Sequence, residues 1–313
     1  MLRRLVAIVG PTASGKSAIA LQLARELGGE IVNADSRQIY RGMDIGTAKP
    51  TSEERRLVRH HLFDIADPAD AYSLALYRRG AVVALESIWE RGNFAWLVGG
   101  TGQYLWALLE NWQVPDVPPD EALRAELTGF ATAHGAAALH ERLASVDPLS
   151  AGRLDARNVR RVVRALEVFQ CTGVPMSTWQ TKGRPDFEFL LFGIDVPRDE
   201  LVERIDRRVD EMFALGFVDE VQRLLEAGVL PGAPALSSIG YSQVIQYLAG
   251  EVTLVLAIEN TKKATRRLAR SQMQWFRRDD PRITWVRAAE GIEMQANIFT
   301  GACTNAIRGE GRP

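Results

Sequence analysis

Short apolar runs alternate with segments of helical periodicity along the first half of the chain. Strands are predicted at residues 5–9, 30–34 and 94–98, and later at 189–196 and 283–286. Apolar residues recur at helical spacing over 16–28, 73–91 and 198–228. Alternation of strands and helices is typical of a parallel sheet that helices cover on both faces. The pattern therefore predicts an α/β fold.

This alternation stops near residue 116. A proline- and acid-rich stretch, "QVPDVPPDEALRAEL", leads into helical patterns, and no strand-like run returns before about residue 187. We therefore expect a core that is split along the chain, in residues 1–115 and 187–290. Residues 116–186 would form a helical insertion domain. The segment 291–313 lacks periodicity and is predicted to be a loose tail.

Composition places the chain among soluble globular proteins. Of its 313 residues, 46% are hydrophobic and 25% are charged, and the formal net charge is −1. The apolar run at 5–9 ends at Gly10-Pro11 and is too short for a signal peptide or a membrane span. Two distant cysteines, Cys171 and Cys303, suggest a reducing compartment, with Cys171 in the core. We expect a cytoplasmic monomer without a membrane partner.

A phosphate-binding motif follows the first predicted strand. The spacing G-x-x-x-x-G-K-[ST] is matched by Gly10, Pro11, Thr12, Ala13, Ser14, Gly15, Lys16 and Ser17. Glycines let the loop N–H groups point inward, and the following helix adds its positive N-terminal end. The lysine supplies a charge to the terminal phosphates, and the serine hydroxyl can hold Mg²⁺. The motif predicts a P-loop NTPase-like core with a nucleotide or pyrophosphate site.

Polar side chains gather where the second and third predicted strands end. Asp35 follows the second strand, ahead of Ser36, Arg37 and Gln38, and "GGTG" at 99–102 follows the third. Ligands of parallel sheets bind outside the carboxyl ends of the strands. Asp35 is therefore expected beside the phosphate loop, where it can act as a general base on a nucleophile.

Two stretches of the chain are strongly basic. One predicted helix carries five arginines within about 100° of one another, namely Arg153, Arg157, Arg160, Arg161 and Arg164. The second stretch, 260–278, has seven basic residues and no acidic one. One such face is usually only solvated, but two of them in a chain of net charge −1 favour a polyanionic partner.

These motifs closely resemble those of the tRNA dimethylallyltransferase (isopentenyltransferase) family. The resemblance runs in order through "GPTASGKS", "ADSRQIYRGMDIGTAKP", "HHLFDI", "LVGGTGQYLWAL", "RNVRRVVRALEV", "RIDRRVDEM", "SIGY" and "QMQWFRR". It implies transfer of a dimethylallyl group from dimethylallyl diphosphate to N6 of the adenine just 3′ of the anticodon, in tRNAs that read codons starting with U. The partners would be the tRNA anticodon stem-loop and the diphosphate, with Mg²⁺ as cofactor.

The resemblance also implies roles for individual residues. Asp35 would take the N6 proton, Thr101 and Arg124 would matter for catalysis, and Lys16 and Ser17 with Mg²⁺ would hold the diphosphate. The expected tRNA contacts are Asp35, Ser36, Arg37, Gln38, Arg160, Arg161, Val162, Val163, Arg164, Arg270, Gln272, Trp275 and Arg277.

Two other functions compete with this interpretation. A small-molecule kinase would use ATP at the same loop, although the arginine faces and the large insertion count against it. A non-catalytic RNA-binding module would not need an intact phosphate loop.

Overall fold

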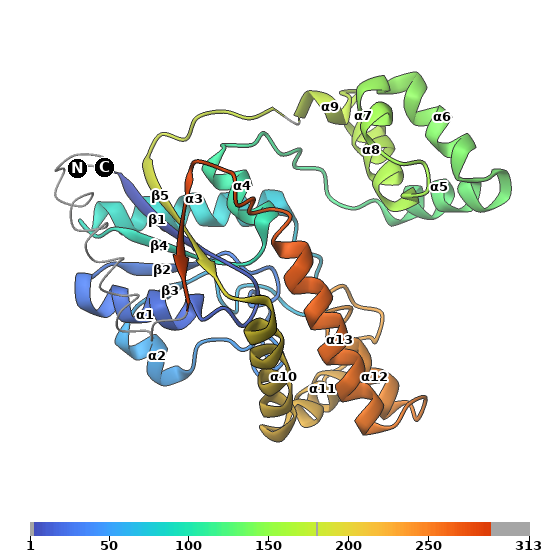
Figure 1. Ribbon diagram of the computed structural model, residues 1–313. Helices are drawn as coiled ribbons and strands as arrows, with labels where there is room; N and C mark the ends of the chain where they lie inside the picture. Colours follow the sequence, from blue (N-terminus) through green and yellow to red (C-terminus); the bar gives the residue numbers. More distant parts are fainter. Residues whose placement is uncertain (1–2, 180, 289–313) are drawn as a thin grey trace. The chain divides into compact units, whose positions relative to one another are not determined.

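The computed structural model describes residues 3–179 and 181–288, and the predicted tail at 291–313 lies outside them. Six parallel strands form one sheet in the order β3-β2-β4-β1-β5-β6 (Figure 1). They are β1 Arg4–Val9, β2 Glu30–Asn33, β3 His60–His61, β4 Ala95–Gly99, β5 Glu188–Asp195 and β6 Ile283–Arg287. The predicted α/β fold with a parallel sheet and flanking helices is confirmed.

Contacts within the chain divide it into two compact units. The described residues of the first are 3–72, 79–105 and 186–288, and they include the sheet. The second contains residues 73–78 and 106–185. Its larger segment therefore begins at Trp106, ahead of the change in composition near residue 116.

Strands β1 and β4 carry continuous apolar runs, Leu5–Val9 and Ala95–Val98, because both faces of the sheet are covered. Strand β1 pairs with β4 on one side, Val6 opposite Trp96, and with β5 on the other, Val6 opposite Leu190. Ile8, Ile19 and Leu23 join Val6 and Trp96 in the core cluster between the sheet and α1.

Six helices of the first unit lie between its strands along the chain. They are α1 Lys16–Leu27, α2 Ser52–Leu57, α10 Arg198–Ala214, α11 Phe217–Glu226, α12 Tyr241–Leu248 and α13 Leu254–Gln272. The helix predicted over 198–228 is two helices, because Gly216, in the left-handed region at φ 95°, separates α10 from α11. Two further helices, α3 Leu74–Glu90 and α4 Gly102–Leu109, cross the boundaries between the units.

The second unit is helical, with a core of its own. Its helices are α5 Glu121–His134, α6 Ala136–Val146, α7 Pro148–Arg153, α8 Val159–Thr172 and α9 Met176–Trp179. Helix α8 begins at the Asn158 cap and ends at Gly173, which adopts the left-handed conformation at φ 70°. Its inward face carries Val162 and Leu166. Cys171 is exposed, so its predicted place in the core is wrong.

Candidate active site

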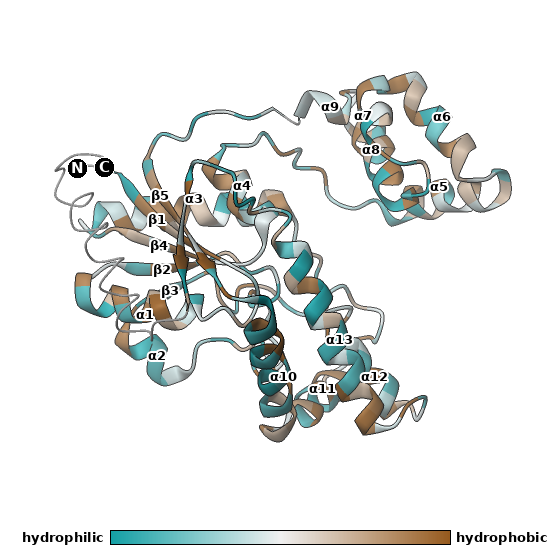
Figure 2. Ribbon diagram, viewed as in Figure 1, coloured by the Kyte–Doolittle hydropathy of each residue, from teal (hydrophilic) through white to brown (hydrophobic). Residues whose placement is uncertain are grey.

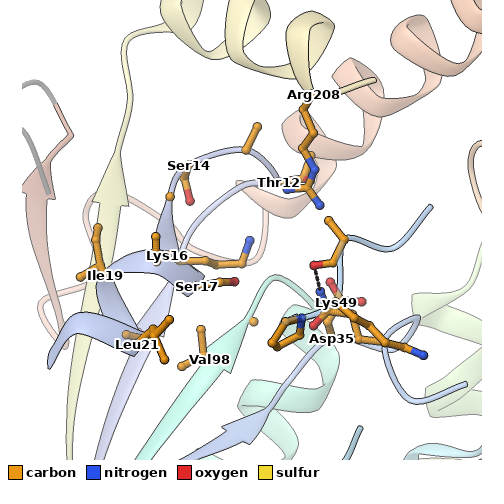
Figure 3. A pocket seen from close by; sticks show the side chains of 18 of the residues that line it. Thr12, Ser14, Lys16, Ser17, Ile19, Leu21, Asp35, Lys49, Val98 and Arg208 are labelled. Carbon is orange, nitrogen blue, oxygen red and sulfur yellow. Dashed lines mark hydrogen bonds between the residues drawn. The ribbon is translucent and has the colours of Figure 1, made fainter. Parts of the chain in front are cut away.

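Loops that follow three strands of the first unit line one cavity of about 850 Å³. The phosphate loop follows β1, the segment from Asp35 to Gln38 follows β2, and Gly99 ends β4. Arg208 of α10 reaches toward the same cavity (Figure 3). The parallel sheet brings these loops together because its strands all end at one edge.

The phosphate loop has the bent backbone that its motif predicts. Gly15 adopts the left-handed conformation at φ 91°, and Ala13 does so at φ 63°. Lys16 and Ser17 are the first two residues of α1, so the positive N-terminal end of this helix faces the cavity. The arrangement suits a phosphate group.

Lys16 is buried at the floor of this loop, with only 8% of its surface exposed. Its Nζ donates a hydrogen bond to the Pro11 carbonyl at 3.3 Å. Burial lowers the pKa of Lys16 from 10.5 to about 8; the nearby Asp35 carboxylate opposes this shift and Arg208 adds to it. A phosphate anion in the cavity would restore the charge that burial disfavours.

Asp35 is held in place by its own loop. Its backbone N–H donates to Asn33 Oδ1 at 2.8 Å, and its Oδ1 accepts the Arg37 N–H at 2.9 Å. Among the described residues, Oδ2 has no hydrogen bond in the structure, and the residue lines the cavity. The carboxylate is thus oriented by one oxygen and leaves the other for a ligand.

Thr101 connects the loop that carries Asp35 to the end of β4 through two hydrogen bonds. Its Oγ1 accepts the Ser36 N–H at 3.0 Å, and its backbone N–H donates to the Ala34 carbonyl at 3.1 Å. A Cβ on Gly99 would lie 2.2 Å from the Ala34 backbone, so only glycine allows this approach. Thr101 therefore positions the segment that carries Asp35.

The polar residues after Asp35 are also partly engaged. Arg37 donates to the Pro234 carbonyl at 3.2 Å. Gln38 Nε2 donates to the Thr47 and Ala48 carbonyls, each at 3.0 Å, while the residue lines the cavity. Their predicted tRNA contacts remain predictions.

Two buried ionic groups anchor the loop that follows. Glu220 of α11 accepts the N–H groups of Asp44, Ile45 and Gly46 at 2.6–3.1 Å, and the Tyr241 hydroxyl at 2.6 Å. In the same loop Lys49, also buried, pairs with Asp44 and Asp64. Gln38, which lines the cavity, is hydrogen-bonded to this loop, so Glu220 and Lys49 help to hold the cavity edge in place.

Arg208 was missed in the sequence prediction. Burial lowers its pKa, while Asp35 and Glu211 oppose the shift. Among the described residues no hydrogen bond is found for its guanidinium. The signal lay in "RIDRRVDEM", where Arg204, Arg208 and Glu211 recur at i, i+4 and i+7 and so share one helix face.

The predicted residues of the second unit form a separate group. Arg124 of α5 binds Glu167 with both ends of its guanidinium, at 2.8 and 3.1 Å, and Arg164 of α8 pairs with the same carboxylate. Glu167 is fully buried, and although burial opposes its ionisation, the hydrogen bonds from Arg124, the Asp120 N–H and Arg164 lower its pKa. Arg124 thus has a structural role in joining α5 to α8, and its role in catalysis remains a prediction.

The five arginines predicted on one helix are divided, because Arg153 ends α7 and Arg157 precedes α8, and only part of the remaining face on α8 is exposed. Arg160 and Arg161 face solvent, whereas Val162 and Val163 lie in the core of the second unit. The two valine side chains therefore do not fit the predicted tRNA contact, because a helix turns its apolar face inward while adjacent arginines face outward.

The basic stretch at 260–278 is less uniform than its sequence suggests. Helix α13 ends at Gln272, so Trp275 and Arg277 lie beyond it. Lys262 and Arg266 pair with Asp210 and Asp206 of α10. Figure 2 shows both helices mainly in the teal of hydrophilic residues.

Other members of this stretch are placed differently. Arg277 pairs with Asp279, Arg270 is exposed, and 42% of the Trp275 surface is exposed. The side chain of Gln272 is buried, so it does not fit the tRNA contact predicted for it. Its Oε1 accepts the Thr12 N–H of the phosphate loop at 2.8 Å.

The residues that the structure describes contain neither a membrane-spanning helix nor a cluster of metal-binding side chains. None of their helices combines the length and apolar character needed to cross a membrane. They contain no group of three or more His, Cys, Asp or Glu side chains that could hold a metal ion.

Sequence comparison places the chain among tRNA-modifying enzymes. The IPP transferase family model matches residues 38–279, and the isopentenyl transferase model matches residues 3–65. The tRNA dimethylallyltransferase of Thermomicrobium roseum is 53% identical over 273 residues, which are 87% of this chain and 83% of the relative. That of Geobacter sulfurreducens is 50% identical over 298 residues, covering 94% and 95% of the two chains.

Solved structures agree with the sequence comparison. The tRNA isopentenylpyrophosphate transferase of Bacillus halodurans aligns with a TM-score of 0.71 and 39% identity, over 98% of this chain and 99% of its own. A eukaryotic dimethylallyltransferase acting on tRNA shares the fold, with a TM-score of 0.83 at 24% identity, over 98% of this chain and 80% of its own. The chain belongs to the tRNA dimethylallyltransferase (IPP transferase) family.

Proposed function

We propose that this protein transfers the dimethylallyl group of dimethylallyl diphosphate to N6 of the adenine immediately 3′ of the anticodon, in tRNAs that read codons starting with U. The products are the N6-(dimethylallyl)adenosine and diphosphate. The observation that carries the proposal is the place of the Asp35 carboxylate in the same cavity as Lys16 and Arg208. One cavity then holds both a base for the nucleophile and cations for the leaving group.

The leaving group is stabilised by the phosphate loop. An allylic diphosphate ionises readily when the charge developing on the departing diphosphate is neutralised. The loop N–H groups and the N-terminal end of α1 supply partial positive charge, and Lys16 supplies a full one. Arg208 can reach the same anion from α10, since its guanidinium is turned into the cavity (Figure 3).

The residues beside the loop fit a magnesium ion. Ser17 and Asp35 both line the cavity and offer one hydroxyl and one carboxylate. Mg²⁺ usually keeps several waters and binds through one or two protein oxygens together with substrate phosphates. When bound, it would neutralise negative charge on the diphosphate oxygens, with Ser17 as its protein ligand.

Asp35 supplies the proton acceptor. The exocyclic amine of adenine is a weak nucleophile, and it gains reactivity as a carboxylate removes its proton while the C–N bond forms. The hydrogen bond from the Arg37 N–H orients Oδ1 and leaves Oδ2 for the amine. Adenine must leave its stack to enter the cavity, so base flipping is part of the proposal.

The proposed RNA contacts are the exposed arginines. Arg160 and Arg161 on α8 and Arg270 on α13 face solvent, as phosphate contacts require. In most P-loop NTPases the strand that here ends in Gly99 ends in an Asp that helps to hold Mg²⁺, but small kinases can have a Gly-rich turn there too. It is therefore the family relationship that counts against the kinase alternative.

Mass analysis of anticodon-loop adenines tests the proposal. Unmodified tRNA is incubated with dimethylallyl diphosphate and Mg²⁺, and a dimethylallyl adduct on the adenine 3′ of the anticodon is expected. Asp35→Asn keeps an acceptor for the Arg37 N–H but removes the base, so single-turnover transfer should slow by about 10²–10⁴. Asp70→Asn, at an exposed carboxylate, is the matched control. A near-normal rate in Asp35→Asn would rule out its role as base, and phosphorylation from ATP without an adduct would support the kinase.

A further inference from the structure

The C-terminal end of α13 lies between two loops of the active site. Gln272, the last residue of this helix, has only 8% of its surface exposed. Its Oε1 accepts the Thr12 N–H at 2.8 Å, so it bonds to the phosphate loop. Its Nε2 lies against the loop after β4, where a Cβ on Gly100 would come within 2.4 Å of it.

The glycines of this second loop fit the end of α13 closely. A Cβ on Gly102 would lie 2.2 Å from Trp275 Cγ, just as one on Gly100 would meet Gln272. Both distances are shorter than real Cβ contacts: a side chain at position 102 would collide with the Trp275 ring, and one at position 100 would displace the Gln272 amide. The "GGTG" loop is therefore shaped by packing against the segment 272–275, while Thr101 within it holds Ser36.

The phosphate loop itself contains few bonds that set its shape. Within it, the structure gives one backbone bond, from the Ser14 N–H to the Pro11 carbonyl at 3.2 Å, and the Lys16 bond to the same carbonyl. Ala13 stands in the left-handed region, which is unfavourable for a residue with a side chain. An outside contact is therefore well placed to stabilise the active conformation.

We propose that Gln272 is a positioning residue for the phosphate loop. By accepting the Thr12 N–H, it holds the loop in the shape in which Lys16 and the remaining N–H groups face the diphosphate. An amide is suited to this task because it is neutral, whereas a carboxylate at this position would repel the bound anion. This inference rests on the proposed function, which places the diphosphate at the loop.

A direct tRNA contact by Gln272 predicts a different result. In that case its loss would weaken binding of tRNA and leave diphosphate binding unchanged. A buried amide that is bonded to the phosphate loop predicts the reverse.

The test uses Gln272→Met, which keeps the length of the side chain and removes the acceptor. The hydrogen bond to the half-buried Thr12 N–H is worth about 1–1.5 kcal/mol, so the Kd for inorganic diphosphate with Mg²⁺ should rise by about 5- to 12-fold. The KM for dimethylallyl diphosphate should rise in parallel, and the Kd for tRNA should stay within about twofold of wild type. Gln274→Met, the same substitution at an exposed glutamine two residues on, should change none of these constants.

Thermal unfolding with and without diphosphate separates positioning from general stability. A positioning role predicts that Gln272→Met loses most of the increase in Tm that diphosphate gives the wild type. A lowered Tm with a full increase from diphosphate would overturn the inference, as would a tRNA defect with normal diphosphate affinity. If Gln272→Met does not fold, Gln272→Ala, which is less crowded against Gly100, takes its place. Failure of the wild type to bind diphosphate would instead refute the proposed function of the loop.

Discussion

The pH dependence of substrate binding follows from the burial of Lys16. Burial lowers the pKa of its ammonium group to about 8, an effect that Asp35 only partly offsets and Arg208 reinforces. The diphosphate of the substrate places negative charge beside this group, which raises its pKa in the complex. Binding of dimethylallyl diphosphate should therefore take up a proton above pH 8 and weaken as the pH rises.

The size of the effect can be worked from the pKa. With a pKa of about 8 in the free protein, and a higher one in the complex, the Kd grows with the fraction of neutral lysine. Between pH 7 and pH 9.5 this amounts to an increase of about 30-fold, and the limiting slope is about tenfold per pH unit. Below pH 7 the ammonium is already charged, so this group adds no further dependence.

Isothermal titration calorimetry without tRNA measures this dependence directly. The Kd is determined from pH 6.5 to 9.5, and proton uptake is obtained from buffers with different heats of ionisation. Lys16→Arg should stay charged and give a nearly constant Kd over this range. Lys16→Met should bind weakly at every pH. A constant Kd in the wild type, or the same slope in Lys16→Met, would refute the role of Lys16 in the dependence.

The remaining predictions concern stability and RNA binding. Glu220→Ala leaves three loop N–H groups and a hydroxyl without their acceptor, so the free energy of unfolding in a denaturant titration should fall by about 3–5 kcal/mol. Burial opposes ionisation of Glu30, but hydrogen bonds from Arg91, Asn93 and His61 hold its pKa at about 2. The stability that the ionised carboxylate adds should be complete above pH 4.5 and lost as the pH falls through 2. The unfolding free energies of the wild type and Glu30→Gln should therefore converge near pH 2. Removing Arg160 and Arg161 together should flatten the slope of log tRNA affinity against log salt by somewhat under one unit for each charge. Arg164→Ala breaks the ion pair with the buried Glu167 carboxylate and should instead lower the unfolding free energy. An unchanged salt slope in the variant that lacks Arg160 and Arg161 would show that this face of α8 is only solvated.

The sequence alone identified the sheet and the phosphate loop, because both depend on short-range patterns. Apolar runs for the strands and the spacing from Gly10 to Ser17 are visible within a few residues. The exception was β3, which consists of His60 and His61 and has no apolar run of its own. It is a strand because it pairs with Ile31 and Val32 of β2.

Tertiary structure decided which polar residues are available to a ligand. Arg266 is basic in the sequence but pairs with Asp206, 60 residues away, and Gln272 bonds to Thr12 across 260 residues. Arg208 belongs to the candidate site because the fold turns α10 toward the cavity. Spacing along the chain determines local backbone shape, whereas ion pairing and the loss of hydration depend on neighbours that only the fold brings together.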